Sequence, residues 1–166
     1  MDKIKMVPVI MRQDFEVIER LANKIWISHY TPIIGKDQVA YMLEKFQSVK
    51  AMQDQIMEGF KYYIITLKGS SVGYIALKPE IDTLFLSKIY VLDTHRGKGI
   101  GRDAMAFVEN KAHICKLKQI RLTVNIHNTK AINVYENMGF HNNGPIVADI
   151  GNGFVMDDYE MIKVIN

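Results

Sequence analysis

Apolar side chains in the first third of the chain recur at steps of three and four residues. One stripe runs over 11–28 and a second over 38–56, with a break between them that contains Pro32 and Gly35. The stripes consist of Phe15, Ile18, Leu21, Ala22, Ile25 and Trp26, then Val39, Met42, Leu43, Phe46, Val49, Met52 and Ile56. This spacing is typical of helices with one buried face. We expect one helix before the break and a second helix, or a helix pair, after it.

After residue 60 the pattern changes to that of β-strands. The runs KYYIITL (61–67) and SVGYIALK (71–78) flank the turn-forming residues KGSS, which predicts an antiparallel hairpin. A third strand is expected at 82–92, directly before a glycine-rich segment. The remaining expected elements are a short strand at 4–10, helices at 104–116 and 128–138, a strand at 120–125, and two strands around the turn GNG at 151–153.

The predicted order is strand, helices, three strands, helix, strand, helix and two strands. No internal repeat, low-complexity tract or linker interrupts it. The chain has 166 residues, 48% of them hydrophobic, which suits one core. We therefore expect a single domain over 1–166 of the α/β (α+β) class, with a largely antiparallel sheet.

Composition limits the chemistry. The net charge of +3 is too small to indicate a nucleic-acid partner by itself. Cys115 is the only cysteine, so an intramolecular disulfide is impossible, and with His113 it supplies too few ligands for zinc. We expect no metal and a buried helix cysteine. The sequence shows neither an apolar run of membrane-spanning length nor a signal-peptide pattern, so we expect a cytoplasmic protein without membrane contact.

The segment RGKGIGRD at 96–103 combines alternate glycines with three cationic side chains. Such a loop before a helix is typical of an anion site, because the first backbone N–H groups of a helix are free and its dipole is positive there. It is not a P-loop, since Gly99 follows Lys98 where Ser or Thr is required. It is not a dinucleotide fingerprint either, because Arg102 stands at the third glycine position. The alternative is a tight turn with a cationic rim.

A second motif follows about thirty residues later. The segment NTKAINVYENMGF at 128–140 has the pattern Asn-x-x-Ala-x-x-x-Tyr-x-x-x-Gly-Phe, and the loop before it has the pattern Arg-x-x-Gly-x-Gly. Together, over about 84–140, these motifs resemble the GNAT superfamily of acyl-CoA-dependent N-acetyltransferases. The resemblance implies a GNAT-like fold, with a central, mostly antiparallel, twisted sheet of about seven strands flanked by about four helices. It also implies acetyl-CoA as the cosubstrate.

The resemblance further implies how the coenzyme is held. The loop amides would wrap its pyrophosphate, and the strand before the loop would lend backbone groups to the pantetheine arm. The residues assigned to the coenzyme in this way are Ile89, Tyr90, Val91, Arg96, Gly97, Lys98, Gly99, Ile100, Gly101, Arg102, Asn128 and Tyr135. Tyr135 would also be catalytic, by protonating the departing thiolate or hydrogen-bonding to it.

Each residue of the second motif also has a structural interpretation. Asn128 and Tyr135 are seven positions apart and project from one face of a helix. Asn128 is as well suited to be the helix N-cap as a ligand contact, and the two roles are compatible. Gly139 is expected as the helix C-cap, and Phe140 as the apolar start of a strand.

The sequence departs from the family at one catalytic position. Many members carry a glutamate in the strand before the loop, where this chain has Ser87, with Lys88 beside it. The general base is therefore unassigned. The acids in or beside strands that could face the cleft are Glu80, Asp82, Asp149, Asp157 and Asp158, each of which has the alternative of a solvated surface charge. Cys115 is far from the thioester position, which favours direct attack by an amine.

The acceptor is a primary amine in this interpretation. WISHYTP and YMLEKF resemble the corresponding region of bacterial polyamine N-acetyltransferases, which would place Trp26, His29 and Tyr30 near the acceptor entrance. Aromatic packing on the core is the alternative for these three. Acetylation of a protein or peptide amine, and a sensor that binds acyl-CoA without turnover, also stay open. Exposed edge strands near the C-terminus allow a homodimer.

Overall fold

The computed structural model describes residues 3–165 and confirms the predicted fold class. The elements are β1 (Ile4–Pro8), α1 (Arg12–Ile34), α2 (Lys36–Gln47), α3 (Val49–Met57), β2 (Lys61–Leu67), β3 (Ser70–Pro79), β4 (Thr83–Val91), the 3₁₀ helix η1 (Asp93–His95), α4 (Ile100–Ile114), β5 (Gln119–Asn125), α5 (Thr129–Asn137), β6 (His141–Gly151) and β7 (Phe154–Val164). Within the described residues, seven strands form one sheet in the order β1-β2-β3-β4-β5-β7-β6. Only β4 and β5 pair in parallel.

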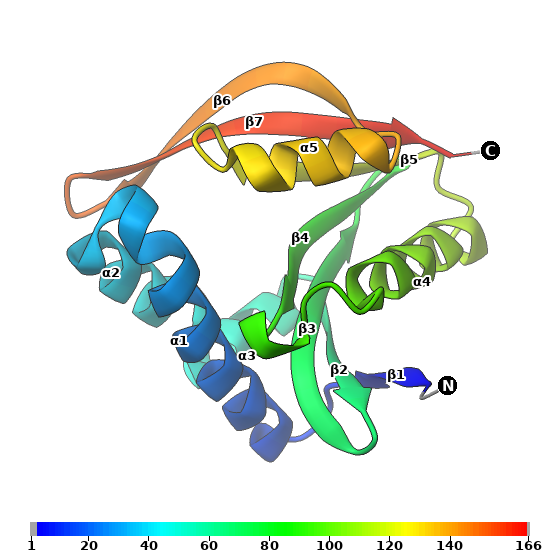
Figure 1. The fold of residues 1–166 in the computed structure, drawn as a ribbon, viewed down its shortest axis with the longest axis horizontal. Helices are drawn as coiled ribbons and strands as arrows, with labels where there is room; N and C mark the ends of the chain where they lie inside the picture. Colours follow the sequence, from blue (N-terminus) through cyan, green and yellow to red (C-terminus); the bar gives the residue numbers. More distant parts are fainter. Residues whose placement is uncertain (1–2, 166) are drawn as a thin grey trace.

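The sheet separates two apolar cores. In Figure 1, α1 and α4 lie on opposite sides of β4. Side chains of α4, together with partly buried ones of α5, pack on one face, where Leu84 and Leu86 of β4 are buried. Helices α1, α2 and α3 cover the other face, where Tyr74 of β3 is buried. The helical stripes and strand alternation predicted from the sequence correspond to these two cores.

Helix α1 is longer than the apolar stripe predicted. The break expected in the segment that contains Pro32 and Gly35 is present, although the helix first continues through Pro32 to Ile34. Proline lacks the N–H that would bond to the carbonyl one turn earlier, but near a helix end this removes only one hydrogen bond. The chain breaks at Gly35, whose φ of 84° lies in the region that favours glycine.

The second predicted helical region is a helix pair. Ser48 is extended between α2 and α3, and its hydroxyl accepts from the N–H of Ala51 at 3.2 Å. The Glu19 carboxylate of α1 accepts from the Val49 N–H at 2.9 Å. These two bonds satisfy free donors at the start of α3. The described residues therefore form five α-helices, where about four were expected.

Strand β6 is an edge of the sheet. Most of its side chains are exposed, including those of Ile146 and Val147, while Ile150 near its end is buried. An edge strand presents unpaired backbone groups to a partner. Homodimer formation stays a prediction.

Candidate active site

A break in the sheet creates a large cavity. Strands β4 and β5 pair only from Thr83 to Phe85, and beyond that point they diverge. Ser87 is an extra residue in β4, since Ala76 of β3 pairs with Lys88 while Leu77 pairs with Leu86. Such a β-bulge bends its strand and increases the local twist. The opening is a cavity of about 750 Å³ that reaches both faces of the sheet.

The predicted glycine loop forms one end of this cavity. Gly97 and Gly99 have φ values of 77° and 78°, and α4 begins at Ile100 directly after them. No hydrogen bond between the N–H groups of 99–102 and a protein acceptor is seen in the described part of the chain. Free N–H groups at a helix start, with open space above Gly101, fit a phosphate ligand.

The three cations of the loop are placed differently. The Arg96 guanidinium bonds to the Asp93 carboxylate at 2.8 Å and donates to the Val91 carbonyl at 3.4 Å, which ties the loop to the end of β4. Arg96 also lines the cavity. Lys98 and Arg102 are exposed and are not among the described residues that line it.

The C-terminal residues of β4, 89–91, form a wall of the cavity. Ile89 and Val91 pack toward α4, while Tyr90 points to the opposite face. The Tyr90 hydroxyl lies 2.8 Å from that of Tyr30 in α1. Because β5 has diverged here, the backbone edge of this segment is open to a ligand. These three side chains are partly buried and belong to the two cores.

Helix α5 brings Asn128 and Tyr135 into the same cavity. The side-chain oxygen Oδ1 of Asn128 accepts from the Ala131 N–H at 3.4 Å, so this residue is the N-cap. Its amide nitrogen lies 3.1 Å from Nε2 of His29, which joins α5 to α1. Tyr135 packs edge-on against Phe140, and burial raises the pKa of its phenol. A raised pKa keeps this hydroxyl protonated throughout the neutral range.

The aromatic residues at the end of α1 also line the cavity. Trp26 is buried, and its indole N–H donates to the Tyr74 hydroxyl at 3.0 Å, so it belongs to the core as well. Burial raises the pKa of Tyr30 to about 12, although the bond to Tyr90 opposes this. Burial, followed by the nearby Arg96 charge, lowers the pKa of His29. His29 is therefore mostly neutral at pH 7.

Two charged residues of the cavity, Lys88 and Asp158, belong to no recognisable motif in the sequence. Lys88 and Asp158 face the side covered by α1, α2 and α3, and Asp158 was only one of five acids considered. Burial lowers the pKa of Lys88 to about 8, while the attraction of Asp158 raises it. Burial raises the pKa of Asp158 to about 6, and Asp157 adds to this rise. Alternation along each strand, corrected for the bulge, is the signal that would have found them.

Of the other four acids, Glu80, Asp82 and Asp149 are exposed, and Asp157 is half-buried. Glu80 pairs with Arg121 at 3.2 Å, and Asp82 lies 3.7 Å from Lys118. Asp149 accepts from the Gly151 N–H in the turn before β7. None of these acids is among the described residues that line the cavity.

The prediction of a buried Cys115 is wrong. This cysteine is exposed and follows the last residue of α4, where Ile114 is also exposed. The apolar stripe of the helix ends one turn earlier, at Ala112, so the cysteine has no core to enter. Since it is not among the described residues that line the cavity, it is not positioned to form a covalent intermediate there.

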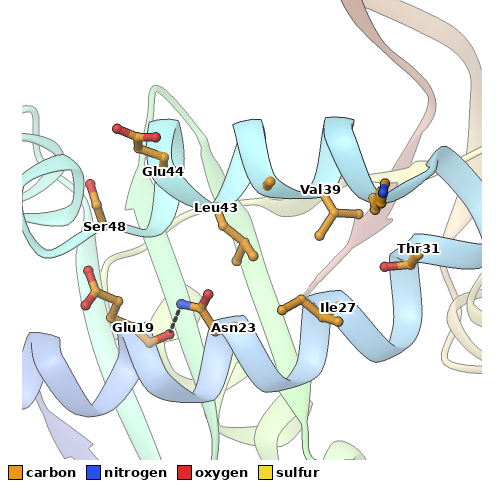
Figure 2. A pocket seen from close by; sticks show the side chains of 10 residues that line it. Glu19, Asn23, Ile27, Thr31, Val39, Leu43, Glu44 and Ser48 are labelled. Atoms are coloured by element: carbon orange, nitrogen blue, oxygen red, sulfur yellow. Dashed lines mark hydrogen bonds between the residues drawn. The ribbon is translucent and has the colours of Figure 1, made fainter.

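A second, smaller pocket of about 450 Å³ lies between α1 and α2. Figure 2 shows Ile27, Val39 and Leu43 pointing into it from the two helices, with polar side chains toward its ends. It shares no described lining residue with the main cavity, since different residues of α1 line the two. The carboxylate of Glu19 at its edge is already engaged in the cap of α3.

Residues 3–165 offer neither a metal site nor a membrane-spanning helix. No group of three or more His, Cys, Asp or Glu side chains there is arranged to hold a metal ion. No helix in that range has the length and apolarity needed to cross a membrane.

Comparison with known proteins identifies the family. A family model described as acetyltransferase (GNAT) domain matches residues 30–162. The spermine/spermidine N(1)-acetyltransferase of Bacillus subtilis (strain 168) is 27% identical over 124 residues, 68% of this chain and 79% of that protein. The PaiA N-acetyltransferase from Thermoplasma acidophilum, crystallised with coenzyme A, matches with a TM-score of 0.81 at 18% identity, over 99% of each chain. A GNAT family acetyltransferase from Elizabethkingia anophelis with acetyl-CoA bound gives a TM-score of 0.63 at 17% identity, over 99% of this chain and 100% of that one. This chain therefore belongs to the GNAT family of acetyltransferases, enzymes that use acetyl-CoA.

Proposed function

We propose that this enzyme transfers an acetyl group to a small primary amine, by direct attack while the amine and acetyl-CoA are bound together. The observation that carries the proposal is one continuous cavity that joins the glycine loop and Tyr135 to a second half walled by α1, α2 and α3. Holding both reactants in one cavity replaces an encounter in solution by attack within a complex.

The residues at the coenzyme end suit a pyrophosphate and an extended arm. The first N–H groups of α4 and the positive-φ backbone at Gly97 and Gly99 suit the anion. The open edge of 88–91 in β4 suits an amide-bearing arm, which would add to the sheet as a further strand. Acetyl-CoA supplies the acetyl group as a reactive thioester.

Tyr135 is assigned to the leaving group. A thiol has an ordinary pKa near 8.5, whereas burial raises the pKa of this phenol above its ordinary value. The hydroxyl therefore remains a hydrogen-bond donor at neutral pH. It would stabilise the negative charge that develops on sulfur as the thioester bond breaks.

The acceptor half supports a small amine with an apolar chain. Met42, Phe46, Phe60 and Phe85 supply apolar surface there, while the charges are the carboxylates of Asp158 and Glu58 against one lysine, Lys88. Carboxylates in an apolar channel suit an ammonium on a methylene chain. The Bacillus subtilis relative, whose name gives spermine and spermidine as substrates, supports the same class. We propose a polyamine as the acceptor.

The test begins with calorimetric titration of acetyl-CoA, with coenzyme lacking its 3′-phosphate and ATP for comparison. Release of free thiol is then measured with spermidine, spermine, free amino acids and peptides bearing an N-terminal or lysine amine. The proposal predicts acetyl-CoA binding and a kcat/KM for a polyamine at least about tenfold above that for a peptide, a difference of about 1.4 kcal/mol. Turnover with peptides alone would replace the polyamine by a protein amine.

A further inference from the structure

Asp158 is a buried carboxylate that opens onto the acceptor half of the cavity. It lies in β7 opposite Asn125, at the end of the β5–β7 ladder, and only 7% of its surface is exposed. Phe154, Met156 and Asp158 alternate along β7 on the face covered by α1, α2 and α3. A carboxylate withdrawn from water in this way needs partners for its charge.

Lys88 is placed on the same side of the cavity by the bulge in β4. Leu84 and Leu86 point toward α4, but the extra residue Ser87 shifts the alternation, so that Lys88 and Tyr90 point the other way. The Lys88 ammonium donates to the Ser87 hydroxyl at 3.0 Å. Among the described residues Lys88 and Asp158 form no direct ion pair within 4.0 Å, although each shifts the pKa of the other. Open cavity therefore lies beside both groups.

The electrostatic surroundings of Asp158 leave it ionised but more basic than an ordinary carboxyl. Burial raises its pKa to about 6, the Asp157 charge adds to the rise, and Lys88 and the Thr123 hydroxyl oppose it. The groups around it are Lys88 from β4, Thr123 from β5, Asp157 from its own strand and the hydroxyl of Tyr30 from α1, with His29 of α1 and Tyr135 of α5 farther along the cavity. Of these, only Asp158 is both anionic at pH 7 and buried in the acceptor half.

We propose that the Asp158 carboxylate accepts the proton that the acceptor ammonium must lose before it attacks, with Lys88 as a positioning residue. This rests on the proposed function. The ammonium gives one proton to Asp158, and its lone pair forms the bond from nitrogen to the acetyl carbon. The bond from that carbon to sulfur then breaks. The thiolate takes up a proton, the new amide nitrogen loses its second one, and Asp158 releases its proton to water.

Lys88 assists without touching the transferred proton. Its positive charge beside the incoming ammonium disfavours a second cation there, which lowers the pKa of the amine. The same charge keeps Asp158 ionised. Ser87 stands where many family members carry a glutamate, and its hydroxyl accepts a hydrogen bond from Lys88. In this proposal the general base is instead Asp158 of β7.

The first measurement compares Asp158→Asn with the wild-type protein. The substitution is nearly isosteric and removes a desolvated charge, so acetyl-CoA affinity should be unchanged, which also shows that the variant is folded. With a polyamine at neutral pH we expect kcat to fall roughly 10²- to 10⁴-fold, the usual contribution of general base catalysis. A kcat within about twofold of wild type would overturn the inference.

A second measurement separates proton transfer from a structural role. Analogues of the best acceptor with fluorine beside the amine lose their proton more readily, while their shape changes little. The ratio of wild-type to Asp158→Asn kcat should shrink with each fluorine, because less proton removal is needed. A ratio that stays constant along the series would contradict the role of proton acceptor, whatever its size.

The pH profile provides the matched control. Wild-type kcat should be lost as the pH falls through about 6, where Asp158 becomes protonated. Asp157→Asn removes the charge that raises the pKa of Asp158, so this acid limb should move to lower pH with an unchanged plateau. If the acid limb does not move in Asp157→Asn, that limb reports the titration of a group other than Asp158. If the wild-type protein binds acetyl-CoA but acetylates no amine, the proposed function fails, which is distinct from failure of the Asp158 variants alone.

Discussion

At the scale of single residues, Tyr135 tests the leaving-group chemistry. Tyr135→Phe removes the donor but keeps the ring that packs on Phe140. We expect kcat to fall roughly 10²-fold or more, with the dissociation constant of acetyl-CoA little changed, because the bond forms only as charge develops on sulfur. Single-turnover kinetics and titration measure the two quantities. The control is Tyr63→Phe, a core position not among the described cavity residues. Equal rates in both variants would show that Tyr135 has only a packing role.

Substitution of Lys88 should shift the acid limb of the kcat profile in the direction opposite to that expected for Asp157→Asn. Its charge lowers the pKa of Asp158, so Lys88→Met should raise that pKa, and the acid limb of kcat should move to higher pH. Loss of a desolvated cation should leave the thermal stability unchanged or slightly higher. The kcat profile between pH 5 and about 8 measures this, with exposed Lys24→Met as the control. If the acid limb does not move, the Lys88 charge does not affect the group that titrates there, which would contradict its proposed role beside Asp158.

Motif spacing identified some of these residues and not others. Asn128, Tyr135 and the loop glycines occur in patterns whose spacing has a physical reason, and the structure brings them into one cavity. Lys88 and Asp158 follow no such pattern. The face to which Lys88 points depends on the bulge at Ser87, and a bulge arises from pairing between strands, which one sequence does not display.

At the scale of elements, the start of α4 can be altered without disturbing the fold. A methyl group on Gly101 would meet no atom within 4 Å, and this glycine has no unusual φ. Gly101→Ala should therefore leave the free energy of unfolding unchanged or raise it by up to about 1 kcal/mol, as expected for a helix. Because the methyl enters the cavity beside the loop, we expect acetyl-CoA affinity to fall at least about tenfold.

The control for this substitution lies on the exposed side of the same helix. Asn110→Ala also improves helix propensity, but its side chain is exposed and is not among the described residues of the cavity. Chemical denaturation and calorimetry on both variants separate stability from affinity. Equal acetyl-CoA affinity in Gly101→Ala and wild type would remove this helix start from the coenzyme site.

Periodicity predicted the elements well and their limits less well. Stripes and alternation predicted the strands and the α-helical regions of the described residues, since burial on one face is a local property of the sequence. They did not predict the 3₁₀ helix η1, and they left open the division of 38–56 into α2 and α3. The expected break contained both Pro32 and Gly35, and only Gly35 ends α1, since a proline near a helix end removes a single hydrogen bond. The divergence of β4 from β5, which forms the site, depends on contacts between distant segments.

At the scale of the whole molecule, coenzyme binding should stabilise the fold. A ligand that binds only the folded state at 100 times its dissociation constant contributes about 2.7 kcal/mol. For a domain of this size that corresponds to a rise in Tm of roughly 5–11 °C. Differential scanning fluorimetry with increasing acetyl-CoA measures it, with ATP as the control. A Tm that does not move at saturating acetyl-CoA would contradict the assigned site.

The short ladder between β4 and β5 has a consequence for the motion of the free enzyme. Only three residue pairs join these strands, so beyond Phe85 the amides of β4 that face away from β3 have no strand partner in β5. They should exchange their hydrogens with solvent much faster than the amides bonded to β3. A bound pantetheine arm that pairs with this edge would slow the exchange over 88–91 while leaving the rest of β4 unchanged. The exchange rates of individual β4 amides would therefore report how much of the enzyme has coenzyme bound.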